Sequence, residues 1–188
     1  MGKVIVEQIV SIDGYAEDAD GGIGFFGDAQ AVNDADEEQL RMLGGVGAIV
    51  LGARTYRMFA DYWPQADPSV EPVAAPIRDL PKFVVSSTLD RAPWGADQSA
   101  TVVRGDGVAS VRDLRRRIDG DLVVWGSLTL SDALLRAGEV GVLRLRMLPL
   151  VLGAGRSFAP PGSRRGWSLA RASSFDAGLV VLEYHADR

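Results

Sequence analysis

Small and hydroxyl-bearing residues follow four hydrophobic runs of this sequence, and residues of these types can bind phosphate. The four segments are residues 11–14, 52–55, 86–87 and 126–127. A strand that ends in glycine and leads into a helix presents backbone N–H groups to an anion. In an open α/β sheet, ligands bind beyond the carboxyl ends of the strands. Four such strand ends in one chain predict a site for an extended ligand that carries phosphate.

The sequence excludes several other chemistries. It has 188 residues with no cysteine and one histidine, so thiolate zinc sites, cysteine nucleophiles and paired-histidine metal sites are excluded. The P-loop pattern G-x-x-x-x-G-K-[ST] is absent, and the Rossmann pattern fails because Val50 stands in place of its last glycine. A net charge of −5 disfavours nucleic-acid binding, and no apolar run is long enough to span a membrane. We therefore expect a soluble, cytoplasmic protein that binds a small molecule.

Hydrophobic runs predict the strands that would bring these four segments together. The runs that we interpret as strands are residues 4–10, 48–51, 82–87, 101–104 and 121–127. Helical patterns lie between most of them, and one short helix, capped by Asn33 or Asp34, extends through Leu43. The proline-rich residues 64–81 are expected to form a mobile surface loop beside the site, with at most one helical turn in it. Strands that alternate with helices predict an α/β sheet of mainly parallel strands.

The pattern changes after residue 140. Two arginines, Arg144 and Arg146, alternate with apolar residues, as expected for a half-exposed strand. Two more strand patterns follow, at residues 167–172 and 179–185. We predict one domain over residues 1–188, with a three-layer α/β/α fold, a mostly parallel central sheet and antiparallel C-terminal strands.

Six segments occur in an order that resembles the dihydrofolate-reductase-like superfamily. They are S-x-D-G-Y at 11–15, L-G-A-R-T-Y at 51–56, F-x-x-Y-W-P at 59–64, F-V-V-S-S-T-L at 83–89, V-V-W-G-S-L-T-L at 123–130 and P-L-V-L-G-A-G at 149–155. No single segment is specific, but the ordered set covers about residues 3–185. It is more similar to the bacterial branch related to the reductase domain of riboflavin biosynthesis than to true dihydrofolate reductase.

The resemblance implies that NADPH binds across the strand ends, with Arg54 paired to its 2′-phosphate. The residues implied to contact NADPH are Gly52, Ala53, Arg54, Thr55, Ser86, Ser87, Gly126, Ser127, Leu128 and Thr129. Their chemistry agrees, because a guanidinium binds phosphate in a bidentate way and helix N-termini hold anions. One departure is that Trp125-Gly126-Ser127 stands where the superfamily has a glycine pair, which leaves the backbone less free to approach the cofactor.

Two carboxylates are candidates for catalysis. Asp36 has the spacing before Gly52 that the substrate-binding acid has in dihydrofolate reductase, and it could bind and help protonate an amino-pyrimidine or pterin-like ring. It could also be one of three acidic residues that favour the helix dipole. Asp13 is the second candidate, although an Asp-Gly turn explains it equally well. The residues that could line the substrate or the nicotinamide are Tyr15, Phe59, Trp63 and Gly155.

The resemblance implies an NADPH-dependent reductase of the riboflavin-reductase type, similar to 5-amino-6-(5-phosphoribosylamino)uracil reductase, which transfers a hydride to a small heterocyclic or ribosylated pyrimidine substrate. Reduction of folate or pterins, a flavin-using reductase, and a nucleotide-binding protein without catalysis are the alternatives. A phosphorylated substrate would need its own basic site, for which Arg156, Arg164 and Arg165 are the nearest candidates. We also expect a homodimer that pairs through edge strands near residues 142–150 and 178–185.

Overall fold

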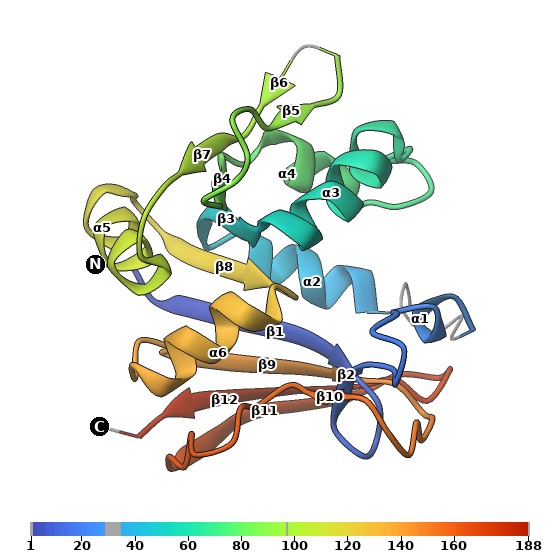
Figure 1. The fold of residues 1–188 in the computed structure, drawn as a ribbon. Coiled ribbons are helices and arrows are strands. Elements are labelled where there is room, and N and C mark those ends of the chain that lie inside the picture. Colours follow the sequence, from blue (N-terminus) through green and yellow to red (C-terminus); the bar gives the residue numbers. More distant parts are fainter. Residues whose placement is uncertain (1, 29–34, 97, 188) are drawn as a thin grey trace.

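The computed structural model describes residues 2–28, 35–96 and 98–187, and its centre is an eight-stranded sheet (Figure 1). In order across the sheet, the strands are β11 (Trp167–Ser174), β12 (Val180–Ala186), β9 (Val142–Met147), β1 (Val4–Val10), β8 (Asp121–Trp125), β3 (Val46–Gly52), β4 (Lys82–Val85) and β7 (Thr101–Val103). The strands from β9 to β7 run parallel to their neighbours, while β12 is antiparallel to both β9 and β11. The predicted sheet is confirmed.

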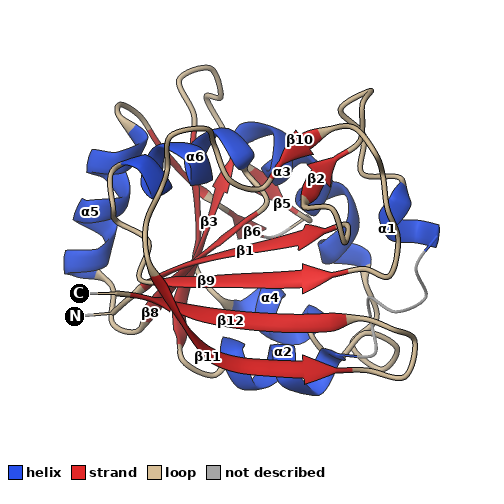
Figure 2. Cartoon of the chain, turned by 90° about the horizontal axis from the view of Figure 1, so that it is seen from below, coloured by secondary structure: helices blue, strands red, loops and turns tan. Residues whose placement is uncertain are grey.

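Helices cover both faces of this sheet, as the three-layer prediction requires (Figure 2). One face carries α5 (Gly107–Arg117) and α6 (Leu128–Arg136), and the other carries α2 (Asp36–Leu43), α3 (Ala53–Tyr62) and α4 (Ala74–Asp79). The short elements are α1 (Phe25–Asp28), η2 (Trp63–Gln65), β2 (Tyr15–Glu17) paired with β10 (Arg156–Ser157), and β5 (Pro93–Trp94) paired with β6 (Gln98–Ser99). No described helix has the length and apolar character needed to cross a membrane.

Strand β1 lies at the centre because its side chains are apolar on both faces. Val4 and Val6 pack with α5 and α6, and Ile5 packs on the opposite face with the α2–α4 layer. Burial of each such side chain contributes about 1.5–3 kcal/mol. The same strand also buries two polar residues, Glu7 and Gln8, which must be hydrogen-bonded to be tolerated there.

Strand β9 is buried on both faces, so the expectation of a half-exposed strand at Arg144 and Arg146 is wrong. The two arginines are only 3% and 6% exposed, because β9 lies between β1 and β12. The alternation along β9 separates an apolar face from a charged one, and both are buried. Leu143 and Leu145 belong to the core under α5 and α6, while Arg144 is paired with the buried Glu7 and the partly buried Glu183.

The edges of the sheet are also not where the sequence placed them. Residues 142–150 and 178–185 were expected to be edges, but β9 and β12 are interior strands, and β11 and β7 are the edges. The strand pattern after residue 140 does not give the order of the strands in the sheet. Strand β11 precedes β12 in the chain but pairs on its outer side, so that β11 is the edge. The homodimer stays a prediction. The expectation that it pairs through β9 or β12 is wrong, because neither strand has a free edge.

The proline-rich stretch is more ordered than a loop. Residues 74–79 form helix α4, in which Ala74 and Ile77 are buried, so the single helical turn expected in this stretch is a six-residue helix. Helix α2 begins at Asp36 as its acidic first turn suggested, and the proposed capping residues Asn33 and Asp34 lie outside the described residues.

Candidate functional site

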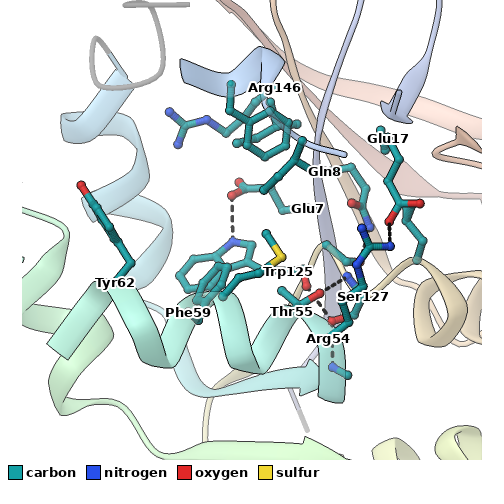
Figure 3. Close-up of a pocket in the computed structure, with 18 of the residues that line it drawn as sticks. Glu7, Gln8, Glu17, Arg54, Thr55, Phe59, Tyr62, Trp125, Ser127 and Arg146 are labelled. Carbon is teal, nitrogen blue, oxygen red and sulfur yellow. Dashed lines mark hydrogen bonds and ion pairs between the residues drawn. The ribbon is translucent and has the colours of Figure 1, made fainter. Parts of the chain in front are cut away.

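A cavity of about 790 Å³ opens at the carboxyl ends of β1, β3 and β8 (Figure 3). Its walls come from these strand ends, from α2 and α3, and from the segment before α4. Eleven of the residues predicted for the site line it together. They are Asp36, Gly52, Ala53, Arg54, Thr55, Phe59, Trp63, Gly126, Ser127, Leu128 and Thr129.

Five predicted site residues lie outside the lining of this cavity. They are Asp13, Tyr15, Ser86, Ser87 and Gly155. The Ser86 hydroxyl accepts hydrogen bonds from the backbone N–H groups of Thr88 and Leu89 at 3.2 and 3.1 Å, so it shapes the turn after β4. The roles predicted for these five residues stay predictions, and the cavity gives them no support.

Asp13 holds a loop in place. Its carboxylate accepts hydrogen bonds from the Ser11 hydroxyl at 2.6 Å and from the N–H groups of Leu152 and Gly153 at 3.1 and 2.7 Å. The Ser11 hydroxyl first, and these N–H groups with it, lower the pKa of Asp13 below its ordinary value. Asp13 is used in holding this loop and is not part of the cavity lining, whereas Asp36 is, so the geometry favours Asp36 over Asp13 as an acid.

The two turns predicted to hold phosphate are hydrogen-bonded directly to each other in the wall of the cavity. The Gly52 N–H donates to the Ser127 hydroxyl at 2.8 Å, and the Ser127 N–H donates to the Thr55 hydroxyl at 2.9 Å. Ser127 has a left-handed backbone with φ 49°, an unusual conformation for a residue other than glycine. This turn starts α6 at Leu128, and the first N–H groups of a helix have no partner within it. The start of α6 could therefore accept an anion at the cavity wall.

The turn between β8 and α6 has Trp125-Gly126-Ser127 where the superfamily has a glycine pair, and the positions of Gly126 and Trp125 show why this is tolerated. Gly126 has φ 51°, and a Cβ there would meet the Thr55 hydroxyl at 3.3 Å. The Trp125 side chain turns toward the α2–α4 layer, where its indole N–H donates to Glu7 at 2.8 Å and its ring lies 5.7 Å from Phe59. Figure 3 shows these two rings side by side on one wall. Trp125 therefore forms an aromatic wall without filling the turn.

Arg54 reaches from the start of α3 to the loop that follows β2. Its guanidinium is paired with Glu17 at 2.9 Å and also donates to the Gly21 carbonyl. The side chain is 61% exposed, so it can exchange partners with a ligand. A phosphate bound at Arg54 would compete with Glu17.

Acidic and aromatic residues gather at the other end of the cavity. Burial raises the pKa of Asp36 above its ordinary value, and the nearby Glu71 carboxylate adds to the rise, while Arg146 opposes it. Tyr62 donates a hydrogen bond to Glu71, which raises the pKa of Tyr62 to about 12. Tyr62 is therefore a weaker acid than an ordinary tyrosine, and Asp36 holds its proton more tightly than an ordinary aspartate does.

Glu7, Gln39 and Arg146 also line the cavity, and the sequence-based predictions missed all three. Glu7 accepts hydrogen bonds from Trp125, from the Gln39 amide at 2.7 Å and from the Arg144 guanidinium at 2.8 Å. One signal was available for Glu7, because a charged residue inside a β-branched run needs a buried partner. Gln39 carried no such signal, since glutamine is common on exposed helix positions.

A basic site for a substrate phosphate is only partly present. Arg156 lines the cavity, and its guanidinium is paired with Asp132 at 2.8 Å. Arg165 instead donates to the carbonyls of Gly138 and Val140. Arg164 and Arg165 are not part of the cavity lining, so of the three predicted arginines the cavity brings in Arg156.

Gly155 supports the site by letting two segments approach closely. It has φ 148°, and a Cβ there would lie 2.0 Å from the Glu17 carbonyl oxygen. We expect Gly155→Ala to lower the free energy of unfolding by more than about 1 kcal/mol, because backbone atoms must move apart. Urea denaturation measures this loss. Gly153→Ala is the matched control, since Gly153 also has a positive φ but no atom within 4 Å; an equal loss in both variants would contradict the contact explanation.

The fold and the cavity together define the class of protein. The chain has a dihydrofolate-reductase-like α/β fold: it matches dihydrofolate reductase of Enterococcus faecalis, solved in complex with NADP(H), with a TM-score of 0.65 and 12% identity over 100% of this chain and 98% of that one. The model of the RibD C-terminal domain family matches residues 2–181. The chain therefore belongs to the RibD C-terminal domain family, and the predicted resemblance is confirmed.

Two further relatives cover almost the whole chain. A protein of Shewanella sp. PV-4 assigned to riboflavin biosynthesis matches with a TM-score of 0.79 and 22% identity over 99% of both chains. The uncharacterized protein YyaP of Bacillus subtilis (strain 168) is 23% identical over 186 residues, which are 97% of this chain and 94% of YyaP. At these identities, the structural matches establish the fold.

Proposed function

We propose that this protein is an NADPH-dependent reductase of the riboflavin-reductase type that transfers a hydride to a small heterocyclic substrate. One observation carries the proposal. The β3–α3 and β8–α6 turns are hydrogen-bonded to each other through Ser127, and they line the same cavity as Asp36 and an aromatic wall. Membership in the RibD C-terminal domain family supports this function, as does the fold shared with an NADP(H)-binding reductase.

The residues of the cavity fit a dinucleotide. The start of α6 and the Arg54 guanidinium would hold phosphate groups, because backbone N–H groups and a guanidinium both bind phosphate oxygens. The apolar part of the cavity, with Phe59 and Trp125, would hold planar rings. When bound, NADPH supplies a hydride, and the protein supplies orientation and a proton.

Asp36 is the residue that we assign to proton delivery. Its carboxyl group lines the cavity on the α2 side, while the phosphate-binding turns belong to α3 and α6. The raised pKa keeps more of this group protonated near neutral pH than an ordinary aspartate would be. A protonated carboxyl group can donate to a ring nitrogen of the substrate as hydride arrives.

The substrate is a heterocycle, and a ribosyl phosphate on it would be bound at Arg156. Reduction of folate or pterins is the second candidate, which the position of Asp36 supports. Both candidates are tested by following NADPH absorbance with a panel of ribosylated pyrimidines, pterins and folates. Turnover of one of these classes identifies the substrate class. Binding of NADPH with no turnover of any of them would favour a nucleotide-binding protein without catalysis.

Arg54 provides a test of the cofactor. We expect NADPH to raise the melting temperature of the wild-type protein more than NADH does, because the 2′-phosphate gains a charge-assisted hydrogen bond. Arg54→Met should bring the two shifts close together. Arg57→Met is the matched control, since Arg57 is exposed on the same helix but does not line the cavity. Equal shifts for the two nucleotides in the wild type would contradict the assignment of Arg54 to the 2′-phosphate.

A further inference from the structure

The amide of Gln39 is held in one orientation by Glu7. The Gln39 Nε2 group donates to Glu7 Oε1 at 2.7 Å, and the Trp125 indole donates to the same oxygen at 2.8 Å. Glu7 Oε2 accepts from Arg144 Nε at 2.8 Å. Because a carboxylate only accepts hydrogen bonds, the NH₂ side of the Gln39 amide must face Glu7. The reverse orientation would put two acceptors in contact inside the protein.

The carbonyl oxygen of Gln39 is therefore directed away from Glu7. Gln39 is only 5% exposed, yet its side chain lines the cavity. Its Oε1 atom accepts no hydrogen bond from the described residues, and it is not among the fully buried polar atoms without a partner. The oxygen therefore keeps some accessible surface, and because the Gln39 side chain lines the cavity, we infer that a molecule bound there can reach it. The structure gives the cavity a hydrogen-bond acceptor with a fixed direction.

Gln39 lies three residues after Asp36 on α2, and residues with this spacing are neighbours on one helix face. Both side chains line the cavity. We propose that Gln39 is a specificity-determining residue that accepts a hydrogen bond from an amino or ring N–H group of the substrate, and that Glu7 is the positioning residue that orients it. This inference rests on the proposed function, because it assigns the heterocycle to the same cavity.

The arrangement selects against a wrong ligand as well as for a right one. A ligand with a carbonyl or an apolar group at this place would leave the Gln39 oxygen without a donor. The amide cannot turn over to offer its NH₂ group, since its oxygen would then meet the Glu7 carboxylate. An unpaired polar group in a cavity costs more than the corresponding hydrogen bond contributes. Discrimination therefore follows from the network behind Gln39 as much as from Gln39 itself.

Two ligands of equal size test the inference by binding alone. They are 2,4-diaminoquinazoline, which offers amino groups, and 2,4-dimethylquinazoline, which replaces them with methyl groups. Calorimetric titration without cofactor gives the ratio of their dissociation constants. We expect the wild type to favour the diamino compound and Gln39→Met to reduce this preference about tenfold. Gln65→Met is the control, because Gln65 is exposed on η2 outside the cavity, and the preference should be unchanged.

Glu7→Gln tests the positioning role with Gln39 left in place. The new amide can donate to the Gln39 oxygen, so the Gln39 amide is free to turn, and the preference should fall although Gln39 itself is unchanged. If Glu7 had a purely structural role, Glu7→Gln would weaken the binding of both ligands equally and leave the ratio of their dissociation constants unchanged. The inference is overturned if folded Gln39→Met keeps the wild-type ratio, or if the wild type binds the two compounds equally or binds neither.

The proposed reductase function is tested separately, by titrating the protein with NADPH and by measuring NADPH oxidation. A protein that binds no NADPH but loses discrimination in Gln39→Met would refute the reductase and retain the specificity role. If the protein oxidises NADPH with a substrate, but Gln39→Met keeps the wild-type ratio of dissociation constants, the reductase function is supported and the specificity role of Gln39 is refuted.

Discussion

Replacing Asp36 with asparagine is expected to lower the turnover number about 10²- to 10⁴-fold, the usual contribution of a general acid. The NADPH dissociation constant should stay unchanged, because the turns at Gly52 and Ser127 belong to other elements. Asparagine keeps the shape of the side chain but cannot deliver an acidic proton. Stopped-flow absorbance of NADPH measures turnover, and fluorescence titration measures binding.

The pH dependence of the same reaction follows from the raised pKa of Asp36. The protonated form is the active one, so turnover should be highest at low pH and fall as pH rises through this pKa. Burial, which raises the pKa, moves the fall to a higher pH than an ordinary aspartate would give. Glu37→Gln is the control, because Glu37 is exposed in the same helical turn. Turnover in Asp36→Asn within threefold of wild type would rule out the assigned role.

Arg144→Met is expected to lower the free energy of unfolding by about 3–5 kcal/mol, the range for breaking a buried ion pair on one side. Arg144 is paired with Glu7 and Glu183, both at 2.8 Å, and lies 3.6 Å from Glu38. Burial disfavours the charged guanidinium, but these carboxylates, Glu7 foremost, more than offset it and raise the pKa of Arg144 above its ordinary value. Methionine fills similar space and leaves the carboxylates without their cation.

Urea denaturation at neutral pH measures this loss. The control is Arg116→Met, since Arg116 is an exposed residue paired with Asp113 on the surface of α5, and such pairs contribute about 0–1 kcal/mol. The prediction would be contradicted if Arg144→Met lowered the free energy of unfolding no more than Arg116→Met does. That result would mean that the carboxylates are satisfied by other partners or by water and that the ion-pair network does not stabilise the fold.

The sequence was sufficient to predict the mainly parallel sheet and the turns that follow β3 and β8, because both depend on local patterns. The apolar run in β1 predicts a buried strand, and the glycine at the end of β3 predicts a turn; each pattern needs only a few neighbouring residues. The alternation in β9 was misinterpreted, because the same pattern describes arginines that face water and arginines that face buried carboxylates. The partner that decides between them, Glu7, is 137 residues from Arg144 in the chain.

The substrate end of the cavity was the least predictable part. Asp36 was a candidate through the family resemblance, and the structure places it on the cavity wall. The orientation of Gln39 depends on a hydrogen bond to Glu7 across 32 residues, and no local pattern encodes such a bond. Ser86 followed a strand end as Gly52 does, but its hydroxyl is used by the turn itself.

The central position of β1 also has a consequence for the order in which the chain can fold. Its neighbours are β8, whose pairing begins 118 residues later at Leu122, and β9, which ends at Met147. During synthesis, both edges of this apolar strand stay unpaired until most of the chain has been made. Such distant pairings make folding slow and leave the strand open to aggregation in the meantime. The part of the cavity that β1 and β8 line can therefore form only after residue 125 has been made.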